Sequence, residues 1–313
     1  MMRSRLLLWL AGALALALLV AFLVGLAVRG TVTARFAEQA AADARLRQAL
    51  LENEVARFRL LPLGLRDDRD LVALMERRPG AQAVMNAKLE RLSREFGSPI
   101  LYVVRGDGLT LAASNWRDPR SFIGKDYSFR PYFRAAMRTG AGEQFALGTV
   151  SHRPGLFFAR RAAGGSVVVM KMEFDRVETQ WREGRGETFV TDRDGVILVT
   201  SRRDWRYAAT LPLSAERRAA KRRTIGVPAL GPAPFELRGD GRIRMPGIAG
   251  DHLLASTSPD ASGWRVNLVV AMGEVNATVR AAQLGAALQR LRWPGLRCSC
   301  ASAGGSAPNA RPS

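Results

Sequence analysis

The stretch from Asp126 to Arg134 contains the residues of this sequence that are best suited to binding chemistry. It reads Asp-Tyr-Ser-Phe-Arg-Pro-Tyr-Phe-Arg, which places three charged groups and four aromatic rings within nine residues. Pro131 fixes its own φ and favours an extended backbone at Arg130. Such a stiff, aromatic segment suits the binding of a small anion, because a guanidinium can pair with a carboxylate through two parallel hydrogen bonds.

A second set of residues is predicted to complete the same site. Residues 148–151 (Gly-Thr-Val-Ser) offer hydroxyls and backbone N–H groups, and Lys171 stands inside the apolar run 167–172. Alternate residues of a strand share a face, so Lys171 would lie with Val167 and Val169. A lysine among buried neighbours is costly unless it is paired, and a bound carboxylate would pair it. Two cations held apart in this way would select short diacids over monocarboxylates, because an unpaired buried cation is penalised.

Each of these residues also has a purely structural interpretation, which the sequence leaves open. Lys171 could pair with Glu173 or Asp126, or extend its ammonium group to solvent. Arg130 could belong to an ordinary ion pair of small energetic value. The aromatic rings could be core residues, as aromatic residues are in many folds.

The composition fits a folded protein and argues against several functional classes. The 313 residues are 47% hydrophobic, and the net charge of +19 comes mainly from scattered Arg, so we expect no nucleic-acid partner. The only cysteines are Cys298 and Cys300, and neither His152 nor His252 lies in the helical His-Glu context of a phospho-accepting histidine. Without a Gly-rich phosphate loop or an acid/base pair, we expect no catalytic residue, metal or cofactor. Whether the chain acts as an enzyme stays open.

The elements that position the site begin with an uncharged N-terminal run. Residues 6–28 carry no charge and are flanked by Arg3, Arg5 and Arg29. At about 1.5 Å per residue they are long enough to cross a hydrocarbon core of about 30 Å. We interpret them as an uncleaved signal anchor, with the N-terminus in the cytoplasm. A cleaved signal peptide is the alternative, and in either case the chain after Arg29 is exported.

Residues 31–59 are predicted to continue as one long helix. Apolar residues recur at helical spacing, but Arg47 interrupts the stripe. The helix could pack on the next domain or act as a signalling stalk that forms a dimer seam without a clean heptad. These interpretations are compatible, and we expect a homodimer. The sequence Leu-Pro-Leu-Gly at 61–64 is predicted to end the helix.

The remainder is predicted to be α+β and to contain an internal repeat. Helices are predicted over 67–77, 81–96, 135–139, 177–186 and 214–223, and strands over 100–104, 109–113, 145–149, 156–161, 166–174, 187–191, 196–200, 235–238, 252–258 and 264–272. The first five strands have the order of a PAS-like sensor fold. Residues 102–108 and 189–195 are alike, each a strand that enters an Asp/Gly turn, which argues for two tandem domains.

Four blocks of the sequence resemble one family closely. The first two are 113–116 (Ala-Ser-Asn-Trp) and 121–133 (Ser-Phe-Ile-Gly-Lys-Asp-Tyr-Ser-Phe-Arg-Pro-Tyr-Phe). The third consists of Gly148, Thr149, Ser151, Pro154 and Gly155, and the fourth is 169–172 (Val-Met-Lys-Met). These blocks are similar to the periplasmic sensor region of the four-carbon dicarboxylate transport sensor histidine kinases, and the similarity extends over residues 6–277. The resemblance implies tandem PAS-like (double Cache, or PDC) domains on a long helix, with succinate, fumarate or malate bound by the membrane-distal domain.

The resemblance also implies roles for particular residues. Tyr127, Arg130 and Tyr132 would contact the ligand. Thr149 and Ser151 would supply hydroxyl and backbone partners. Lys171 would hold the opposite carboxylate, and Phe157 stands where the family often has Tyr.

We expect five segments in the chain. They are a cytoplasmic tip and transmembrane anchor (1–29), a stalk with helices (30–98), a membrane-distal ligand-binding domain (99–177), a membrane-proximal domain (178–277) and an aberrant tail (278–313). The tail changes in composition and lacks a second apolar span, which we interpret as a frameshifted or truncated end, with a disordered tail as the alternative.

The expected function is periplasmic sensing of C4-dicarboxylates as the input module of a two-component sensor kinase, without the kinase core in this chain. A cognate response regulator would be a partner of the full-length relative only. The alternative is the extracytoplasmic sensor of a chemoreceptor or cyclase that binds another small acid or an amino acid.

Overall fold

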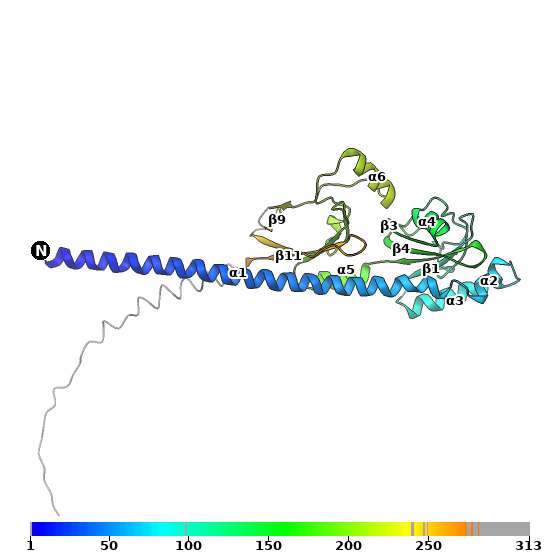
Figure 1. Ribbon diagram of the computed structural model, residues 1–313, viewed down its shortest axis with the longest axis horizontal. Helices are drawn as coiled ribbons and strands as arrows, with labels where there is room; N and C mark the ends of the chain where they lie inside the picture. The colour runs from blue at the N-terminus through cyan, green and yellow to red at the C-terminus, as the bar shows by residue number, and fades with distance from the viewer. Residues whose placement is uncertain are drawn as a thin grey trace, which may run out of the picture. The chain divides into compact units, whose positions relative to one another are not determined.

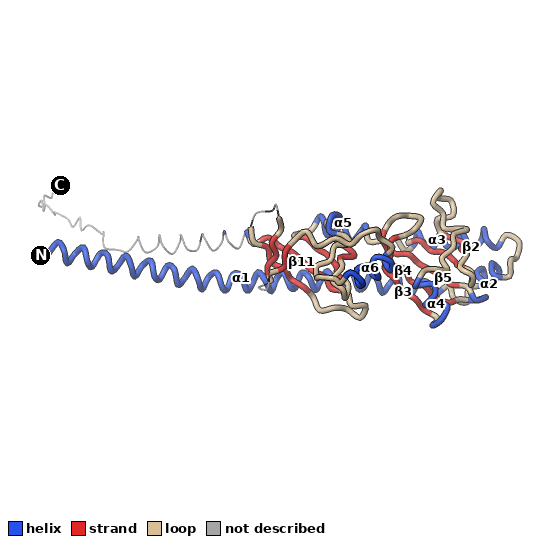
Figure 2. The backbone as a smooth tube through the Cα atoms, turned by 90° about the horizontal axis from the view of Figure 1, so that it is seen from above, coloured by secondary structure: helices blue, strands red, loops and turns tan. Residues whose placement is uncertain are grey.

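The computed structural model describes residues 2–97, 99–238, 241–246, 248, 250–273, 277 and 281, and for most of residues 2–28 it describes the backbone without the side chains. The chain divides into two units, one of residues 1–36 with 273–313 and the other of residues 37–272. Both β-sheets lie in the second unit (Figures 1 and 2). The aberrant tail predicted for 278–313 lies outside the described residues, apart from residue 281.

The N-terminal element is the long helix α1 (Met2–Gly64). Within residues 37–64 it buries Ala40, Ala44, Leu51 and Phe58, the stripe expected from the sequence. Arg47 interrupts that stripe because it has a partner in the second sheet: it donates to Thr188 Oγ1 and, at 2.8 Å, to the carbonyl oxygen of Arg185. The break expected at 61–64 was placed too early. The helix continues through Pro62, which removes one backbone hydrogen bond of the last turn, and ends at Gly64.

In the part of the chain that the structure describes, no helix is both long and apolar enough to cross a membrane. The transmembrane helix expected over residues 6–28 is therefore not shown by the structure, and it stays a prediction from the sequence.

The first sheet is antiparallel, with five strands in the order β2-β1-β5-β4-β3, as predicted. The strands are β1 (Ile100–Val104), β2 (Thr110–Ala113), β3 (Ala141–Leu147), β4 (Pro154–Arg161) and β5 (Val167–Met172). The accompanying helices are α2 (Arg69–Met75), α3 (Ala81–Glu95), α4 (Pro131–Thr139) and the 3-10 turn η1 (Ala163–Gly165). Helix α4 begins at Pro131 rather than at residue 135, because proline fits the first turn of a helix.

Helix α5 (Asp175–Glu183) leads into a second antiparallel sheet with the order β7-β6-β11-β10-β9-β8. Its strands are β6 (Glu187–Thr191), β7 (Ile197–Thr200), β8 (Glu236–Leu237), β9 (Arg242–Arg244), β10 (His252–Ser256) and β11 (Arg265–Ala271), and η2 (Arg203–Trp205) and α6 (Ala215–Ile225) lie between β7 and β8. Strand β9 was missed because Arg-Ile-Arg offers a single apolar residue. The repeat is real: the β1–β2 and β6–β7 hairpins each carry a register shift, at Val103/Val104 and Val190/Thr191.

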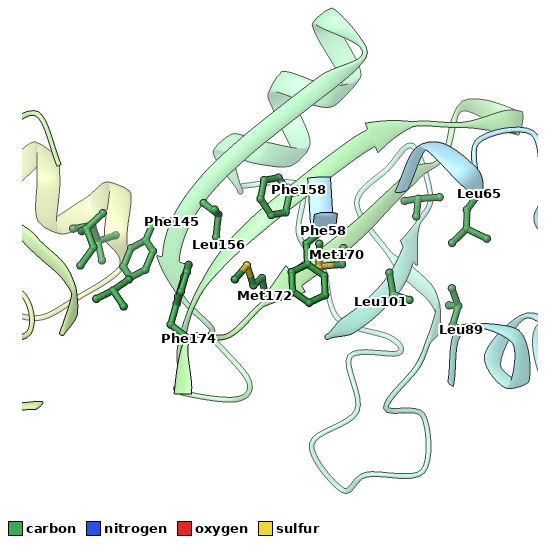
Figure 3. Close-up of a cluster of buried hydrophobic side chains, with 14 of the residues drawn as sticks. Phe58, Leu65, Leu89, Leu101, Phe145, Leu156, Phe158, Met170, Met172 and Phe174 are labelled. Atoms are coloured by element: carbon green, nitrogen blue, oxygen red, sulfur yellow. The ribbon is translucent and has the colours of Figure 1, made fainter. Parts of the chain in front are cut away.

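The two faces of the first sheet pack against different helices. One face joins α1 and α3, and Figure 3 shows Phe58 of α1 close to Phe158 and Met170 of the sheet. The opposite face packs on α4 and includes Val167 and Val169 of β5, whereas Val168, Met170 and Met172 belong to the α1 side. The alternation predicted for β5 is therefore correct. Full burial of each such side chain stabilises the fold by roughly 1.5–3 kcal/mol.

Candidate functional site

Arg130 precedes the first turn of α4 and is almost fully buried. Its backbone is extended (φ −74°, ψ 131°), as the following proline favours. Its side chain lies in the α4-side core with 4% of the residue exposed, and its Nη2 donates to the carbonyl oxygen of Leu147 at the end of β3 (2.9 Å). Among the described residues, its Nε has no hydrogen-bond partner, and no carboxylate forms an ion pair with it. A buried guanidinium with an unused donor is well suited to receive an anion.

Lys171 is completely buried in β5 (0% exposed) and faces α4, on the side predicted from the alternation. Its Nζ donates to Ser151 Oγ (2.7 Å) and to Glu173 Oε1 (2.5 Å). Burial lowers the pKa of Lys171, and the nearby Glu173 carboxylate opposes that shift. Of the alternatives left open by the sequence, pairing with Glu173 is the one that the structure shows. Asp126 instead accepts a hydrogen bond from the backbone of Ser128 (2.7 Å).

The Phe157 ring lies close to both cations. Arg130 Cζ and Lys171 Nζ are each 5.9 Å from the centre of the Phe157 ring, so the two charges are separated by at most twice that distance. Phe157 pairs with Lys171 across β4 and β5, and its ring stacks on Tyr132 (5.0 Å between centres, 3° between planes). An aromatic face attracts cations, so this stack holds both charges on one side of the sheet.

Three tyrosine hydroxyls surround the same cluster. Tyr132 shares a hydrogen bond with Tyr102 (2.7 Å between hydroxyl oxygens), and the Thr149 side chain acts to lower the pKa of Tyr127, against the larger effect of burial. Burial raises the pKa of Tyr127 to about 12 and raises the pKa values of Tyr132 and Tyr102 as well. All three are therefore neutral at ordinary pH and can donate hydrogen bonds.

The loop between β3 and β4 brings Thr149 and Ser151 to this cluster. It closes through hydrogen bonds from Gly148 N to the Arg153 carbonyl and from His152 N to the Gly148 carbonyl (3.0 Å each). Gly148 is required by space: a Cβ there would overlap Ser151 Oγ and lie 3.2 Å from Lys171 Nζ. Thr149 itself is exposed.

The structure thus gathers all seven predicted residues on one face of the first sheet or in the adjoining β3–β4 loop. One aromatic residue of the opening motif does not join them: Phe129 is 48% exposed, with the Arg130 guanidinium carbon 5.2 Å from its ring centre. It does not wall a buried site.

Sequence reasoning missed Tyr102 as a member of the site and considered Glu173 only as an alternative partner of Lys171. Tyr102 could have been found from the alternation of β1, because Tyr102 pairs with Val169 across β1 and β5 and so shares the face of Lys171. Glu173 lies two residues beyond Lys171, so it also falls on the same side of an extended chain.

A cavity of about 270 Å³ adjoins the Lys171 end of the cluster. Ser151, Arg153 and Glu173 form one side of it, and Asn115 and Phe122 are among the residues that line the rest. Arg153 carries two ion pairs there, to Glu173 (2.9 Å) and to Asp175 (2.5 Å). The cavity is therefore polar where it meets Ser151 and Glu173, the two hydrogen-bond partners of Lys171. No group of His, Cys, Asp or Glu suited to a metal ion occurs among the described residues.

Comparison with known proteins connects this architecture to one family. The chain is 39% identical over 254 residues to the C4-dicarboxylate transport sensor protein DctB of Rhizobium meliloti, covering 76% of this chain and 41% of that protein. It is 32% identical over 210 residues to the protein of the same name from Pseudomonas aeruginosa, covering 66% of this chain and 33% of that protein. The chain thus spans less than half the length of these relatives. No protein-family model matches it.

Among solved structures, the sensor domain of the V. cholerae histidine kinase DctB superposes with a TM-score of 0.67 at 21% identity, covering 76% of this chain and 97% of that one. The sensory domain of the Campylobacter jejuni chemoreceptor Tlp3 superposes with a TM-score of 0.54 at 11% identity, covering 80% of this chain and 98% of that one. These two likenesses concern the fold alone. Taken with the sequence identities, they confirm the resemblance: the chain belongs to the family of C4-dicarboxylate transport sensor proteins, and its described body has the fold of their sensor domain.

Proposed function

We propose that the face of the first sheet between Arg130 and Lys171 binds a short dicarboxylate such as succinate, fumarate or malate. The observation that carries the proposal is the pair of buried cations that both lie close to the Phe157 ring, one of them without a carboxylate partner among the described residues. One ligand carboxylate would pair with the Arg130 guanidinium and the other with the Lys171 ammonium group. The tyrosine hydroxyls and Ser151 would supply neutral donors.

The same arrangement explains the selectivity that we propose. A monocarboxylate would satisfy one cation and leave the other buried without a new partner, at a cost in free energy. The stacked rings of Phe157 and Tyr132 would face the hydrocarbon portion of the ligand. Because Phe157 has no hydroxyl group, recognition of the ligand would rely on Tyr127, Tyr132 and Tyr102 for phenolic donors.

In the cell, we propose that this chain is the periplasmic input module of a two-component sensor kinase anchored in the inner membrane. It would work as a homodimer, with a response regulator as the partner of a kinase core. Ligand binding would favour one arrangement of the sensor over another, and it can shift that equilibrium only by its difference in affinity for the two. The contacts of α1 with both sheets, through Arg47 and through Phe58, offer a physical connection from the site to the stalk.

Calorimetry tests the binding proposal directly. The full chain, purified in mild detergent, is titrated with succinate, fumarate and malate, and acetate and L-isoleucine serve as control ligands. We expect saturable heat from the diacids and none from acetate. Heat from succinate equal to the buffer blank would overturn the proposal. Saturable heat from L-isoleucine alone would favour an amino-acid sensor instead.

A further inference from the structure

Lys171 already holds a carboxylate in this structure. The Glu173 Oε1 atom lies 2.5 Å from Lys171 Nζ, and the glutamate side chain is only 19% exposed. The two residues alternate along the segment that leaves β5, which brings their side chains to one side. A dicarboxylate that reaches Lys171 therefore meets a cation whose charge is already balanced.

Glu173 also has a second cation. Its Oε2 atom lies 2.9 Å from Arg153 Nη1, and the Arg153 side chain is 51% exposed. Arg153 in turn reaches Asp175 at the start of α5 (2.5 Å). If Lys171 paired with another anion instead, Glu173 would keep its ion pair with the partly exposed Arg153. The Lys171–Glu173 contact can therefore open without leaving Glu173 unpaired.

The ammonium group of Lys171 has three N–H donors, and Ser151 and Glu173 take two of them. A ligand carboxylate that took the third donor would stand beside Glu173, and two carboxylates that share one cation repel each other. Whether a ligand displaces Glu173 or joins it, the negative charge of Glu173 opposes binding.

We propose that Glu173 is an internal competitor for the ligand carboxylate and sets the affinity of the site. This inference rests on the proposed function, because it requires a ligand carboxylate at Lys171. Binding then includes an exchange of partners: Lys171 turns from Glu173 to the ligand, and Glu173 keeps Arg153. Glu173 thereby acts as an affinity-setting residue that need not touch the ligand.

The test is Glu173→Gln, which removes the charge and keeps both the shape and an oxygen that can accept from Lys171. In titrations of the full chain with succinate, we expect this variant to bind about tenfold more tightly than wild type, equivalent to about 1.4 kcal/mol. Glu173→Asp keeps the charge and should stay within a few-fold of wild type. The matched control is Glu143→Gln on β3, a carboxylate paired with Arg59 (3.0 Å) away from Lys171, which should leave the affinity unchanged.

Thermal unfolding of each ligand-free variant verifies that it folds. If wild type binds succinate and Glu173→Gln binds it equally or more weakly, the inference fails and the proposed function stands. If neither protein binds succinate, both fail.

Discussion

The two sheets share one plan and differ in what they bury on corresponding faces. In each sheet the first strand lies between its hairpin partner and the last strand: β1 between β2 and β5, and β6 between β7 and β11. On β1 the face towards α4 buries Tyr102, which joins a cluster of tyrosines and two cations. The corresponding residue of β6 is Phe189, which packs with Trp205 and Phe235 in an apolar cluster.

The buried charges differ in the same way. In the second sheet region, the buried Glu178 and the partly buried Arg206 form an ion pair (2.5 Å), so each charge has an internal partner. In the first sheet region, Arg130 is as buried as Glu178, but no described carboxylate pairs with it. A buried charge that pairs with an opposite charge of the same fold has a structural role. A buried charge without such a partner can instead bind an oppositely charged ligand. The comparison shows that the same fold can contain a structural ion pair and a candidate binding site, and that a few side chains decide which of the two is present.

The largest expected effect concerns alkaline pH. Three of the four tyrosines lie at the first sheet, and Tyr207 lies near the second. Burial raises the pKa of Tyr127 to about 12, above the unfolded value of about 10. The unfolded state therefore loses its proton first, so the stabilisation is complete below about pH 10 and is lost as the pH rises to about 12. Tyr127 alone accounts for roughly 3 kcal/mol.

Burial also raises the pKa of Tyr207 to about 12, but the first sheet region holds two further tyrosines with raised pKa values. We expect hydrogen exchange at rising pH to show the first sheet opening before the second. Earlier opening of the second sheet would contradict the expected difference between the two sheets.

Replacing the buried cation is the next largest effect. Lys171→Met should weaken succinate binding by about 100-fold or more, roughly 2.7 kcal/mol, because one carboxylate loses its cation. The ligand-free protein should melt at or above the wild-type temperature, since methionine fills similar space and Glu173 keeps Arg153. The control Arg265→Met removes an exposed cation from β11. Equal losses of affinity in the two variants would mean that Lys171 has no special role.

Arginine-to-lysine changes distinguish the role of Arg130 from that of Arg206. Arg130→Lys keeps the charge but loses the planar fork and the bond to the Leu147 carbonyl, so succinate affinity should fall about tenfold, or about 1.4 kcal/mol. Arg206→Lys should lower the melting temperature and leave the affinity unchanged, because Arg206 serves the pair with Glu178. Calorimetry and thermal melting on both variants check this contrast. An affinity loss in Arg206→Lys alone would reverse it.

The smallest expected effect compares two tyrosine hydroxyls. Tyr127→Phe removes the interaction of the hydroxyl with the Thr149 side chain and should destabilise the protein by about 1 kcal/mol. Among the described residues, the buried hydroxyl of Tyr207 has no partner, so Tyr207→Phe should be neutral or stabilising by a similar amount. Denaturant unfolding measures both changes. A clear destabilisation in Tyr207→Phe would show that its hydroxyl is satisfied in solution.

Local patterns predicted much of the fold and part of the site. The alternation in β5 placed Lys171 on the face that packs on α4, and the Asp/Gly turns predicted both hairpins. The stripe on α1 identified its buried face, and the four similar blocks identified the family. Short or charged elements were harder: β9 was missed, and α4 was placed too late because Pro131 was not recognised as the first residue of the helix.

By itself, the sequence determined the features that depend on neighbouring residues: the period of each element, the extended backbone that Pro131 imposes on Arg130, and the side of β5 that Lys171 takes. Only the tertiary structure decided which distant groups meet. It paired Lys171 with Glu173 and Ser151, left Arg130 with the Leu147 carbonyl and an unused donor, and gave Arg47 a partner in the second sheet. The physical reason is that such contacts depend on strand register and on packing between elements far apart in the chain, which no local pattern specifies.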